Sequence, residues 1–473
     1  SPLYVSSLSS SGTSVTSSAS DDVIEEERNV SSSFSTSPSI DWSSHELPPL
    51  ADRRYVFTPF EKSLLFAGLY LGSIIGTQPI GWLVRRVGAR WSMTANGIIS
   101  ILLTVSLPYV VAFSFPLFVV WRLLAGATFS MLFPVAGIVV ASWAPQTQRG
   151  LFVGVLCAHL ELAALFTMPM SGIIAQAVSW PAVYYMHAAI VAVTTALWVI
   201  LYRDDPRDHA MISSCELALI QEGKGDVVSA RQRPEPPYRR IFSTRSLWAC
   251  FAAVLGTYFP AQFSITFAPS YISYVLGFSA AAAGALTVIP LLLQAIFKFA
   301  AGWLSDRLTM IDETLKVRCF NSAGLFLSAL FFVLIAVVPF GAAVALDLAL
   351  IILAVACLGL HAGGFPKCVV LVTREHSAFV MSIVQMLAGV AMATGSLVVP
   401  SLTAHLSDVD EWRRVFLLYA LSLLFGNTLF VLFADADAAE WTEQEKERRK
   451  KKEEEHGGAF HNISLRSNGS RCP

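Results

Sequence analysis

The amino-acid sequence predicts an all-α protein that crosses a membrane many times. Of its 473 residues, 54% are hydrophobic and 14% are charged, whereas soluble globular proteins carry about 25% charged residues. The apolar residues form runs long enough to cross a bilayer, which takes roughly 20 residues in a helix. A net charge of −1 gives no reason to expect a nucleic-acid partner.

The first 55 residues are rich in serine and include an acidic run at positions 21–27. They lack the apolar content that a folded core needs, so residues 1–55 are predicted to be disordered. Asn29 stands in an Asn-Val-Ser sequence, which is a glycosylation acceptor if this segment faces the lumen or the exterior.

Eleven apolar spans follow, five before a long polar stretch and six after it. Their approximate ranges are 63–84, 93–113, 115–143, 151–177, 181–202, 247–276, 280–304, 320–340, 342–372, 378–406 and 415–434. We therefore predict two helical bundles, one of five spans over residues 56–202 and one of six spans over 247–434. Residues 203–246 are the predicted loop between them, and 435–473 are a charged tail.

Basic residues set the predicted orientation, because loops on the cytoplasmic side carry the excess of lysine and arginine. Most basic residues follow an odd-numbered span. They are found in loop 203–246, in the tail and at Arg85, Arg86, Arg90, Arg149, Arg307, Lys316, Arg318 and Arg374. The other loops are short and mostly uncharged, apart from Arg413 and Arg414. Loop 203–246 and the tail are therefore predicted to be cytoplasmic, and residues 1–55 luminal or extracellular.

One stretch stands out, residues 115–150, because its apolar span contains an arginine. Arg122 lies about seven residues from the predicted outer end of the helix, or roughly 10 Å deep. A charge at that depth either reaches back to the interface along its flexible chain or serves a function. Small residues at Ala125, Gly126 and Ala127 would let a neighbouring helix approach it.

Glu161 is the acid predicted to lie deepest, roughly 15 Å from the start of its span at residue 151. Burial at that depth makes a carboxyl group easy to protonate. We predict that Glu161 couples proton movement to the function of the protein. The alternative is a neutral glutamic acid that only forms a hydrogen bond to a neighbouring helix. His159 is two residues away, so it lies on another helical face and is predicted to be a packing residue.

Two lysines lie near predicted cytoplasmic helix ends, where lysine commonly reaches the interface. That interpretation is preferred for Lys298. For Lys367, the nearby Gly363, Gly364 and Pro366 predict an interrupted helix, and irregular backbone at depth usually lines a cavity. Lys367 could therefore add positive charge to an anion pathway. Weaker candidates for the same cavity are His361 and Gln385. The aromatic residues Tyr258, Phe259 and Phe263 are predicted to pack between helices in the first place and to form a pocket wall in the second.

The two predicted bundles share a short repeat. Gly81-Trp82-Leu83-Val84-Arg85-Arg86 and Gly302-Trp303-Leu304-Ser305-Asp306-Arg307 both end a span that enters the cytoplasm. Internal repeats of this kind are typical of secondary transporters. The two copies occupy equivalent places in a six-plus-six arrangement if one further helix precedes residue 63. We therefore expect twelve spans in the complete architecture, of which eleven are present.

Several motifs together resemble the major facilitator superfamily, in particular its anion:cation symporter branch, which holds sialin, the vesicular glutamate transporters and sodium/phosphate cotransporters. The similarity covers residues 57–441. The motifs are R-L-L-x-G at 122–126, F-P at 133–134, S-W-A-P with arginine at 142–149, P-M-S-G at 169–172, P-S-Y with V-L-G-F at 269–278, G-W-L-S-D-R at 302–307, G-F at 364–365 and E-W-R-R-V-F at 411–416.

The resemblance implies two helical bundles that rock about a central anion site. It assigns Arg122 to attracting the anionic group of the substrate, and Gly81, Arg86, Gly302, Asp306 and Arg307 to a motif that controls the conformational change. Other family positions differ. Phe129 stands where the branch has an acid. Phe66 and Thr257 stand where some members have a histidine and an arginine, and Arg85 stands where the first loop motif has an acid. An N-H-L-D run falls on residues 368–371, which read C-V-V-L.

The sequence thus predicts a secondary active transporter of small organic or inorganic anions, coupled to H⁺ or Na⁺. The predicted substrate-binding residues are Arg122, Lys367, Gln385 and Tyr258. We expect an integral multi-pass protein, monomeric, in the plasma membrane or an endosomal, lysosomal or vesicular membrane. No enzymatic activity, metal site or cofactor is predicted. The alternatives are a family member that has lost transport and acts as a sensor or scaffold, and an unrelated polytopic receptor.

Overall fold

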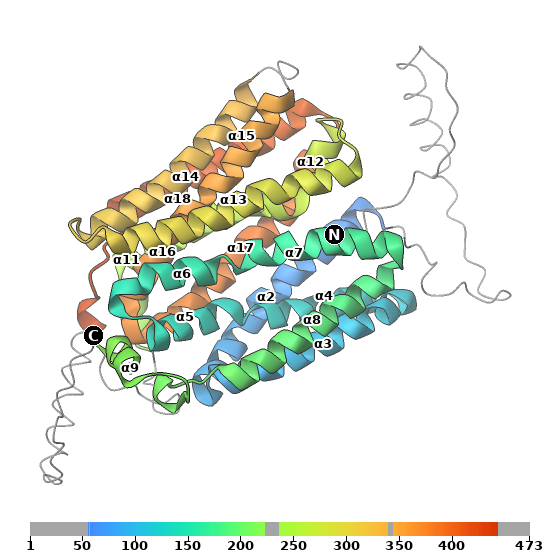
Figure 1. The fold of residues 1–473 in the computed structure, drawn as a ribbon. Helices are drawn as coiled ribbons and strands as arrows, with labels where there is room; N and C mark the ends of the chain where they lie inside the picture. Colours follow the sequence, from blue (N-terminus) through green and yellow to red (C-terminus); the bar gives the residue numbers. More distant parts are fainter. Residues whose placement is uncertain (1–54, 56, 223–235, 339–343, 443–473) are drawn as a thin grey trace, which may run out of the picture.

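A computed structural model describes residues 55, 57–222, 236–338 and 344–442 of the chain. This part of the chain is helical, and eleven of its helical spans are long and apolar enough to cross a membrane. The predicted fold class and the eleven spans are therefore confirmed. Figure 1 shows the spans running roughly parallel to one another, with α3 and α8 along one side of the molecule and α14 and α15 along the other.

The first half of the chain supplies five spans. Two of them consist of consecutive helices. The helices are α2 (Pro59–Val87), α3 (Ala89–Phe113), α4 (Phe115–Phe129), α5 (Leu132–Trp143), α6 (Arg149–Cys157), α7 (His159–Ala177) and α8 (Trp180–Leu201). Two short helices lie in the polar stretch that follows, α9 (Ser214–Gln221) and α10 (Tyr238–Ser243).

The second half supplies six spans, two of which are interrupted by short non-α turns. They are α11 (Arg245–Gln262) with the π-helical turn η6 (Phe263–Phe267) and α12 (Ala268–Tyr274), α13 (Ala280–Arg307), α14 (Glu313–Val337), α15 (Val344–Cys357) with the 3₁₀ turn η7 (Leu358–Gly363) and α16 (Phe365–Thr373), α17 (Ser377–Leu402) and α18 (Val409–Phe433).

Local sequence explains where the helices begin and end. Thr58 caps α2 through a reciprocal capping box with Glu61, and Pro59 follows at the first helical position. The helix ends at Gly88, whose φ of +94° suits a residue without a side chain. The predicted interruption near Gly363 is confirmed, because α15 gives way to η7 and then to α16 around Gly364.

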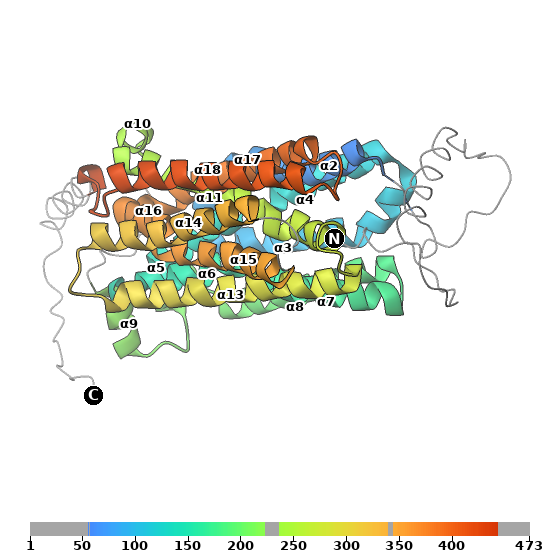
Figure 2. The same ribbon diagram turned by 90° about the horizontal axis from the view of Figure 1, so that it is seen from above.

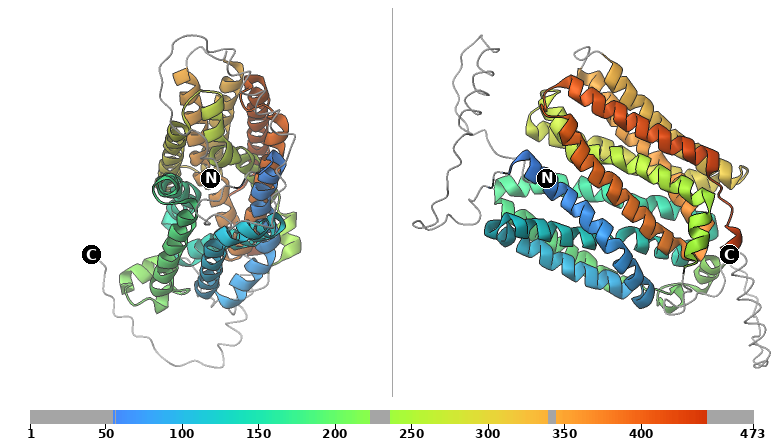
Figure 3. Two further views of the ribbon diagram at one scale, coloured as in Figure 1. Left: turned by 90° about the vertical axis from the view of Figure 1, so that its right-hand side faces the viewer. Right: turned by 180° about the vertical axis from the view of Figure 1, so that it is seen from behind.

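The two halves meet along two pairs of contacts. On one side α17 of the second half packs against α2 and α5, and on the other side α13 packs against α6 and α7. Figure 2 shows these two contacts at opposite edges of the molecule, and Figure 3 shows α2 and α17 running side by side. A movement of one half relative to the other would therefore take place at these two contacts.

A cluster of aromatic rings holds the π-helical turn of the second half in place. The Phe263 ring lies 5.4 Å from Phe416 and 6.3 Å from Phe332, measured between ring centroids. Phe263, Phe332 and Phe416 are all nearly inaccessible to solvent. Aromatic pairs at these distances stabilise a packed core beyond the area that they bury, so η6 rests on a rigid support.

Candidate functional site

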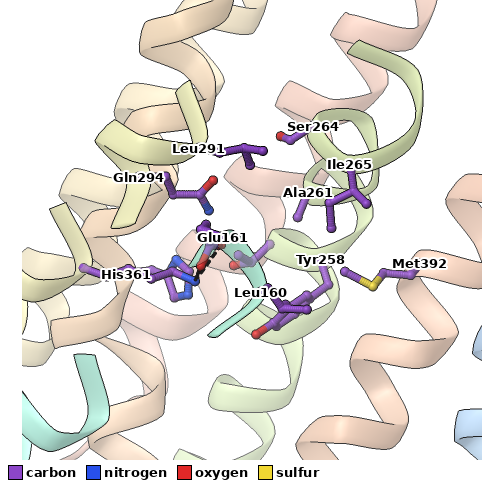
Figure 4. A pocket seen from close by; sticks show the side chains of 12 residues that line it. Leu160, Glu161, Tyr258, Ala261, Ser264, Ile265, Leu291, Gln294, His361 and Met392 are labelled. Atoms are coloured by element: carbon purple, nitrogen blue, oxygen red, sulfur yellow. Dashed lines mark hydrogen bonds and ion pairs between the residues drawn. The ribbon is translucent and has the colours of Figure 1, made fainter. Parts of the chain in front are cut away.

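A small pocket lies where the two halves of the molecule meet. Figure 4 shows that its wall combines polar side chains with apolar ones. The lining residues are Leu160 and Glu161 of α7, Thr257, Tyr258 and Ala261 of α11, Ser264 and Ile265 of η6, Leu291, Gln294 and Lys298 of α13, His361 of η7 and Met392 of α17. Three of these elements, α7, η6 and η7, begin at or form an interruption of a span, which agrees with the rule that irregular backbone at membrane depth lines a cavity.

A buried ion pair joins the two halves at this pocket. The Lys298 ammonium donates to both carboxylate oxygens of Glu161, with Nζ···Oε1 and Nζ···Oε2 distances of 2.8 Å. The Lys298 side chain is 2% exposed and the Glu161 side chain 7%. Glu161 belongs to α7 in the first half and Lys298 to α13 in the second, so the pair connects α7 with α13.

The preferred interpretation of Lys298 from the sequence was wrong. Lysine near a helix end commonly extends along the helix to reach water, and that was the expectation for this residue. Its ammonium instead points inward and is enclosed by the other half of the protein. The physical reason is the acid on the facing helix, because a carboxylate and a carbonyl group supply the ligands that water would otherwise provide.

An interruption of the backbone prepares the site for this pair. The span that carries Glu161 breaks at Ala158, which separates α6 from α7. The carbonyl of Cys157, at the end of α6, accepts a third hydrogen bond from Lys298 at 2.8 Å. Glu161 lies in the first turn of α7, where the partial positive charge of a helix N-terminus stabilises a carboxylate.

The rest of the pocket wall offers hydrogen-bonding groups. His361 bonds through Nδ1 to the Leu358 carbonyl, so Nδ1 carries the proton and Nε2 of the neutral ring is an acceptor. Among the described residues that line the pocket, His361 Nε2 and Ser264 Oγ are buried without a hydrogen-bond partner. Buried polar atoms are normally satisfied, so these two atoms are available to a molecule in the pocket.

Tyr258, predicted to pack between helices and secondarily to form a pocket wall, does both, because it lines the pocket and also contacts the other half. Its ring meets Phe133 of α5 edge-on, at a centroid distance of 6.0 Å. Phe133 makes a second edge-to-face contact with the ring of His159, at a centroid distance of 5.7 Å. His159 bonds through Nδ1 to the Leu156 carbonyl at 2.8 Å, which fits its predicted packing role.

Arg122 does not line the pocket. Its Nε donates to the Leu65 carbonyl of α2 at 3.2 Å, and the electrostatic influence of Tyr70 and Tyr184 reaches its guanidinium group. Within the described part of the chain no carboxylate forms an ion pair with Arg122. An unneutralised guanidinium among phenol rings retains its attraction for an anion, so the predicted role of Arg122 stays a prediction.

Gln385 lies at the contact between α17 and α2. Its Nε2 donates to Ser73 Oγ at 3.2 Å, whereas Oε1 is buried without a partner among the described residues. Nearby, Tyr70 of α2 donates its hydroxyl proton to Gln262 of α11 at 2.8 Å. Gln385 is thus part of a polar contact between the halves, and its assignment to substrate binding stays a prediction.

Lys367 lies away from the pocket lining, at the end of the molecule where the loops rich in lysine and arginine gather. This end, which includes Arg149, Arg307 and Arg374, is called the basic end below. Its ammonium is 3.2 Å from Asp306 Oδ1 and 3.1 Å from Glu313 Oε2, and it donates to Ser305 Oγ at 2.9 Å. These partners belong to the end of α13 and the start of α14. In this arrangement Lys367 holds the carboxylate of the second G-W-L motif in position.

The second copy of the repeat, residues 302–307, forms hydrogen bonds to the first half of the protein, and this contact is called the Asp306 clasp below. Asp306 accepts hydrogen bonds from the backbone N–H groups of Gly150 at 2.9 Å and Leu151 at 2.7 Å. A carboxylate at the start of a helix is favourable, and here the helix is α6 of the other half. Gly302 makes the close approach possible, because a Cβ at that position would lie 2.4 Å from the Gly150 carbonyl oxygen.

The first copy occupies the equivalent position at the other contact. Gly81 faces Ser382 of α17, where an added Cβ would lie 2.9 Å from the hydroxyl. In both copies an arginine one turn later covers an exposed tryptophan, with Arg86 5.5 Å from the Trp82 ring and Arg307 5.2 Å from the Trp303 ring. The copies differ at two positions, where Val84 and Arg85 of the first correspond to Ser305 and Asp306 of the second. Arg85 stacks on Phe379 at 5.3 Å, whereas Asp306 accepts hydrogen bonds from the backbone of α6.

Some lining residues were missed or given another role in the sequence analysis, chiefly Lys298, Gln294 and Ser264. One signal was available. Gln294 and Lys298 are polar residues four positions apart inside an apolar span, and this spacing puts both on one helix face. Ser264 carried no such signal, because a serine satisfies itself on its own helix in most spans. The predicted glycosylation site, Asn29, lies outside the described residues.

Comparisons with known proteins agree with this geometry. The profile of the Major Facilitator Superfamily matches residues 8–372. The mouse sodium-dependent phosphate transport protein 3 is 26% identical over 396 residues, which cover 82% of this chain and 81% of the relative. Human sialin is 24% identical and zebrafish vesicular glutamate transporter 3 is 22% identical, covering 82% and 83% of this chain and 78% and 67% of those proteins.

Two solved structures share the fold. The proton:xylose symporter XylE, bound to 6-bromo-6-deoxy-D-glucose, aligns with a TM-score of 0.61 at 15% identity and covers 80% of this chain and 88% of its own. The human organic anion transporter MFSD10 aligns with a TM-score of 0.53 at 18% identity and covers 78% and 83%. The predicted resemblance to the anion:cation symporter branch and the integral, multi-pass character are confirmed. The chain is not an enzyme; it belongs to the Major Facilitator Superfamily of membrane transporters.

Proposed function

We propose that this protein moves small anions across a membrane by alternating access and that the movement is coupled to H⁺. The observation that carries the proposal is the buried Glu161–Lys298 pair, which lines the pocket and belongs to both halves at once. Ionisable residues inside a membrane protein commonly mark ion and proton pathways. An anionic substrate is supported by the relatives, which include a phosphate transport protein, a vesicular glutamate transporter and sialin.

Coupling to H⁺ is preferred over coupling to Na⁺ because of the composition of the pocket wall. Glu161 is the single carboxylate among the described lining residues. One carboxylate can take up one proton, whereas a Na⁺ ion bound to the same carboxylate would lie beside the Lys298 ammonium and be repelled by it. The proposal therefore assigns Glu161 to proton coupling.

The remaining predicted residues take roles that fit their positions. Arg122, near the predicted outer end of its helix, would attract the anion towards the pathway, and Tyr258 would form part of the pocket wall. Gln385 would contribute where α17 meets α2. Lys367 would act through Asp306, whose clasp on α6 must open when the basic ends of the two halves separate.

The test is uptake by the purified protein in proteoliposomes. Phosphate, urate, glutamate and sialate would be offered separately under imposed H⁺ and Na⁺ gradients. We expect an H⁺ gradient to drive uptake of at least one of them. Arg122→Ala should weaken the apparent affinity about 10- to 100-fold, the loss of one charged hydrogen bond. Arg414→Ala, an exposed arginine of α18, is the matched control and should leave uptake unchanged.

Two results would contradict the proposal. Uptake driven by Na⁺ but not by H⁺ would overturn the assignment of the coupling ion. Binding of an anion by folded protein without gradient-driven uptake would indicate the sensor that the sequence analysis kept as an alternative.

A further inference from the structure

The pocket holds one positive and one negative side chain, and each neutralises the other. Among the described residues that line it, Lys298 is the single cation and Glu161 the single anion. Both carboxylate oxygens lie 2.8 Å from the ammonium. An anion that enters this pocket therefore meets a lysine ammonium that is already paired with Glu161.

We propose that transport proceeds by an exchange of counter-ions on Lys298. The anionic group of the substrate replaces Glu161 on the Lys298 ammonium, and Glu161 takes up one proton as it leaves. This inference rests on the proposed anion transport and deepens it, because it names Lys298 as the residue that binds the anion. It also specifies the substrate class as small anions with a single net negative charge.

The charge balance of the buried site requires the two events to occur together. A buried cation without a partner is costly, and so is a buried carboxylate. If the anion binds and Glu161 stays ionised, the pocket holds two negative charges and one positive charge. If Glu161 becomes neutral, the pocket has no net charge before and after binding. No covalent bond forms or breaks; one proton moves from the aqueous side to a carboxylate oxygen of Glu161.

The geometry of the pair supports such an exchange. The ammonium of Lys298 already accommodates the two oxygens of a carboxylate, so another carboxylate or a phosphate oxygen pair fits the same hydrogen bonds. The Cys157 carbonyl, at 2.8 Å from Nζ, stays in place and keeps the ammonium oriented while its counter-ion changes. Lys298 is thus held by the backbone of α6 independently of Glu161.

The groups around the pair leave Glu161 as the one that takes the proton. His361 of η7 and His159 of α7 each bond through Nδ1 to a backbone carbonyl, so a second proton on either ring would add another positive charge near the Lys298 ammonium. Cys157 of α6 and Tyr258 of α11 are the other titratable groups near Glu161, and both are neutral in their protonated forms. The Nε2 atom of His361 can accept the O–H of protonated Glu161.

The exchange also explains how binding releases the two halves. The Glu161–Lys298 pair ties α7 to α13, which are in different halves. When the substrate occupies Lys298, the tie is replaced by a contact between one helix and a small molecule. The empty protein keeps its counter-ion pair, so it does not carry an uncompensated charge through the membrane.

The experiment combines infrared spectroscopy with flux measurements on the purified protein. At mildly acidic pH, phosphate, urate, glutamate and sialate each carry one net negative charge. Addition of a transported anion should produce the C=O stretch of a protonated carboxylic acid, and this band should be absent in Glu161→Gln. In proteoliposomes the parent should take up one H⁺ for each anion, and an imposed membrane potential should not change the rate.

Variants separate coupling from binding. Glu161→Gln should still bind the anion, with affinity that no longer depends on pH, and should move it without H⁺. Lys298→Gln should lose binding at least 100-fold. Asp410→Asn is the matched control, because it makes the same carboxylate-to-amide change in the exposed ion pair with Arg413, and it should behave as the parent does.

The outcomes distinguish this inference from the proposed function. H⁺-driven uptake that continues to carry H⁺ in Glu161→Gln, or that responds to membrane potential in the parent, would overturn the counter-ion exchange and leave anion transport standing. The stoichiometry and the response to potential need only the parent protein, so the inference can be refuted even if a variant fails to fold. Absence of any uptake would overturn both.

Discussion

At the scale of single residues, Glu161 and Lys298 depend on each other. Their side chains are 7% and 2% exposed, so neither charge is compensated by water. Removing one partner of a buried pair costs about 3–5 kcal/mol, whereas replacing both by apolar residues of similar volume is often neutral. The pair therefore adds little to stability as a whole, which fits a functional reason for its presence.

The mutual dependence of Glu161 and Lys298 predicts a specific pattern of stability. Lys298→Met should destabilise the protein at neutral pH by about 3–5 kcal/mol. The combination of Lys298→Met with Glu161→Leu should recover most of that loss, because no unpaired charge remains. The measurement is thermal unfolding in detergent micelles, arranged as a double-mutant cycle.

The exposed pair of Arg413 and Asp410 provides the comparison within the same protein. Surface ion pairs contribute about 0–1 kcal/mol, so Asp410→Asn should change the unfolding temperature little. Equal destabilisation by Lys298→Met and by the double substitution would mean that packing volume, and not charge, determines stability at this site.

At the scale of elements, the contact between α6 and α13 depends on glycine. The carbonyl of Gly150 lies where the side chain of residue 302 would be, 2.4 Å from an added Cβ. Backbone atoms cannot move aside as a flexible side chain can. The contact that Asp306 strengthens with two hydrogen bonds therefore exists only while residue 302 has no side chain.

Gly302→Val should consequently push the ends of α6 and α13 apart and favour a state in which the basic end of the molecule is open. The separation would be measured by double electron–electron resonance in a cysteine-free background. The spin labels would replace two exposed residues, Gln148 just before α6 and Thr309 just after α13. We expect a longer mean distance in the variant than in the parent.

Gly284→Val on the same helix is the matched control, because nothing lies within 4 Å of an added Cβ there. The distance between the labels should remain that of the parent in this control. An unchanged distance in Gly302→Val would show that the helices adjust without separating.

At the scale of the whole molecule, the two halves carry copies of the same repeat, but the two contacts that these copies make between the halves differ in strength. The contact of α13 with α6 has the clasp of Asp306, whereas the contact of α2 with α17 has Arg85 at the corresponding position. A cation near the start of a helix is unfavourable, and a carboxylate there is favourable. The contact of α2 with α17 is thus predicted to be the weaker of the two at the basic end.

Arg85→Asp should therefore strengthen this contact by providing a carboxylate for the N–H groups at the start of α17. We expect an unfolding temperature at or above that of the parent and slower uptake, because opening the basic end would require breaking two clasps. Arg414→Asp on α18 is the control, because it makes the same change of charge at an exposed position outside both copies of the repeat, and it should leave the rate near that of the parent. Faster uptake in Arg85→Asp would refute the comparison of the two copies.

The sequence by itself determined the class of fold and the repeat. Long apolar runs can only be membrane helices, because backbone groups in lipid must be satisfied within the segment. The G-W-L repeat appears at equivalent contacts of the two halves, and the interruption at Gly363 and Gly364 follows from local backbone chemistry. Each of these features depends on residues near one another in the chain.

Only the tertiary structure decided which charges meet. Glu161 and Lys298 are 137 positions apart, and Asp306 and Gly150 are 156 positions apart. No periodicity connects residues across such distances, and Lys298 near a helix end has the same local sequence whether it reaches water or a buried carboxylate. The choice depends on what the facing helix offers, and that is fixed only when α13 packs against α6 and α7.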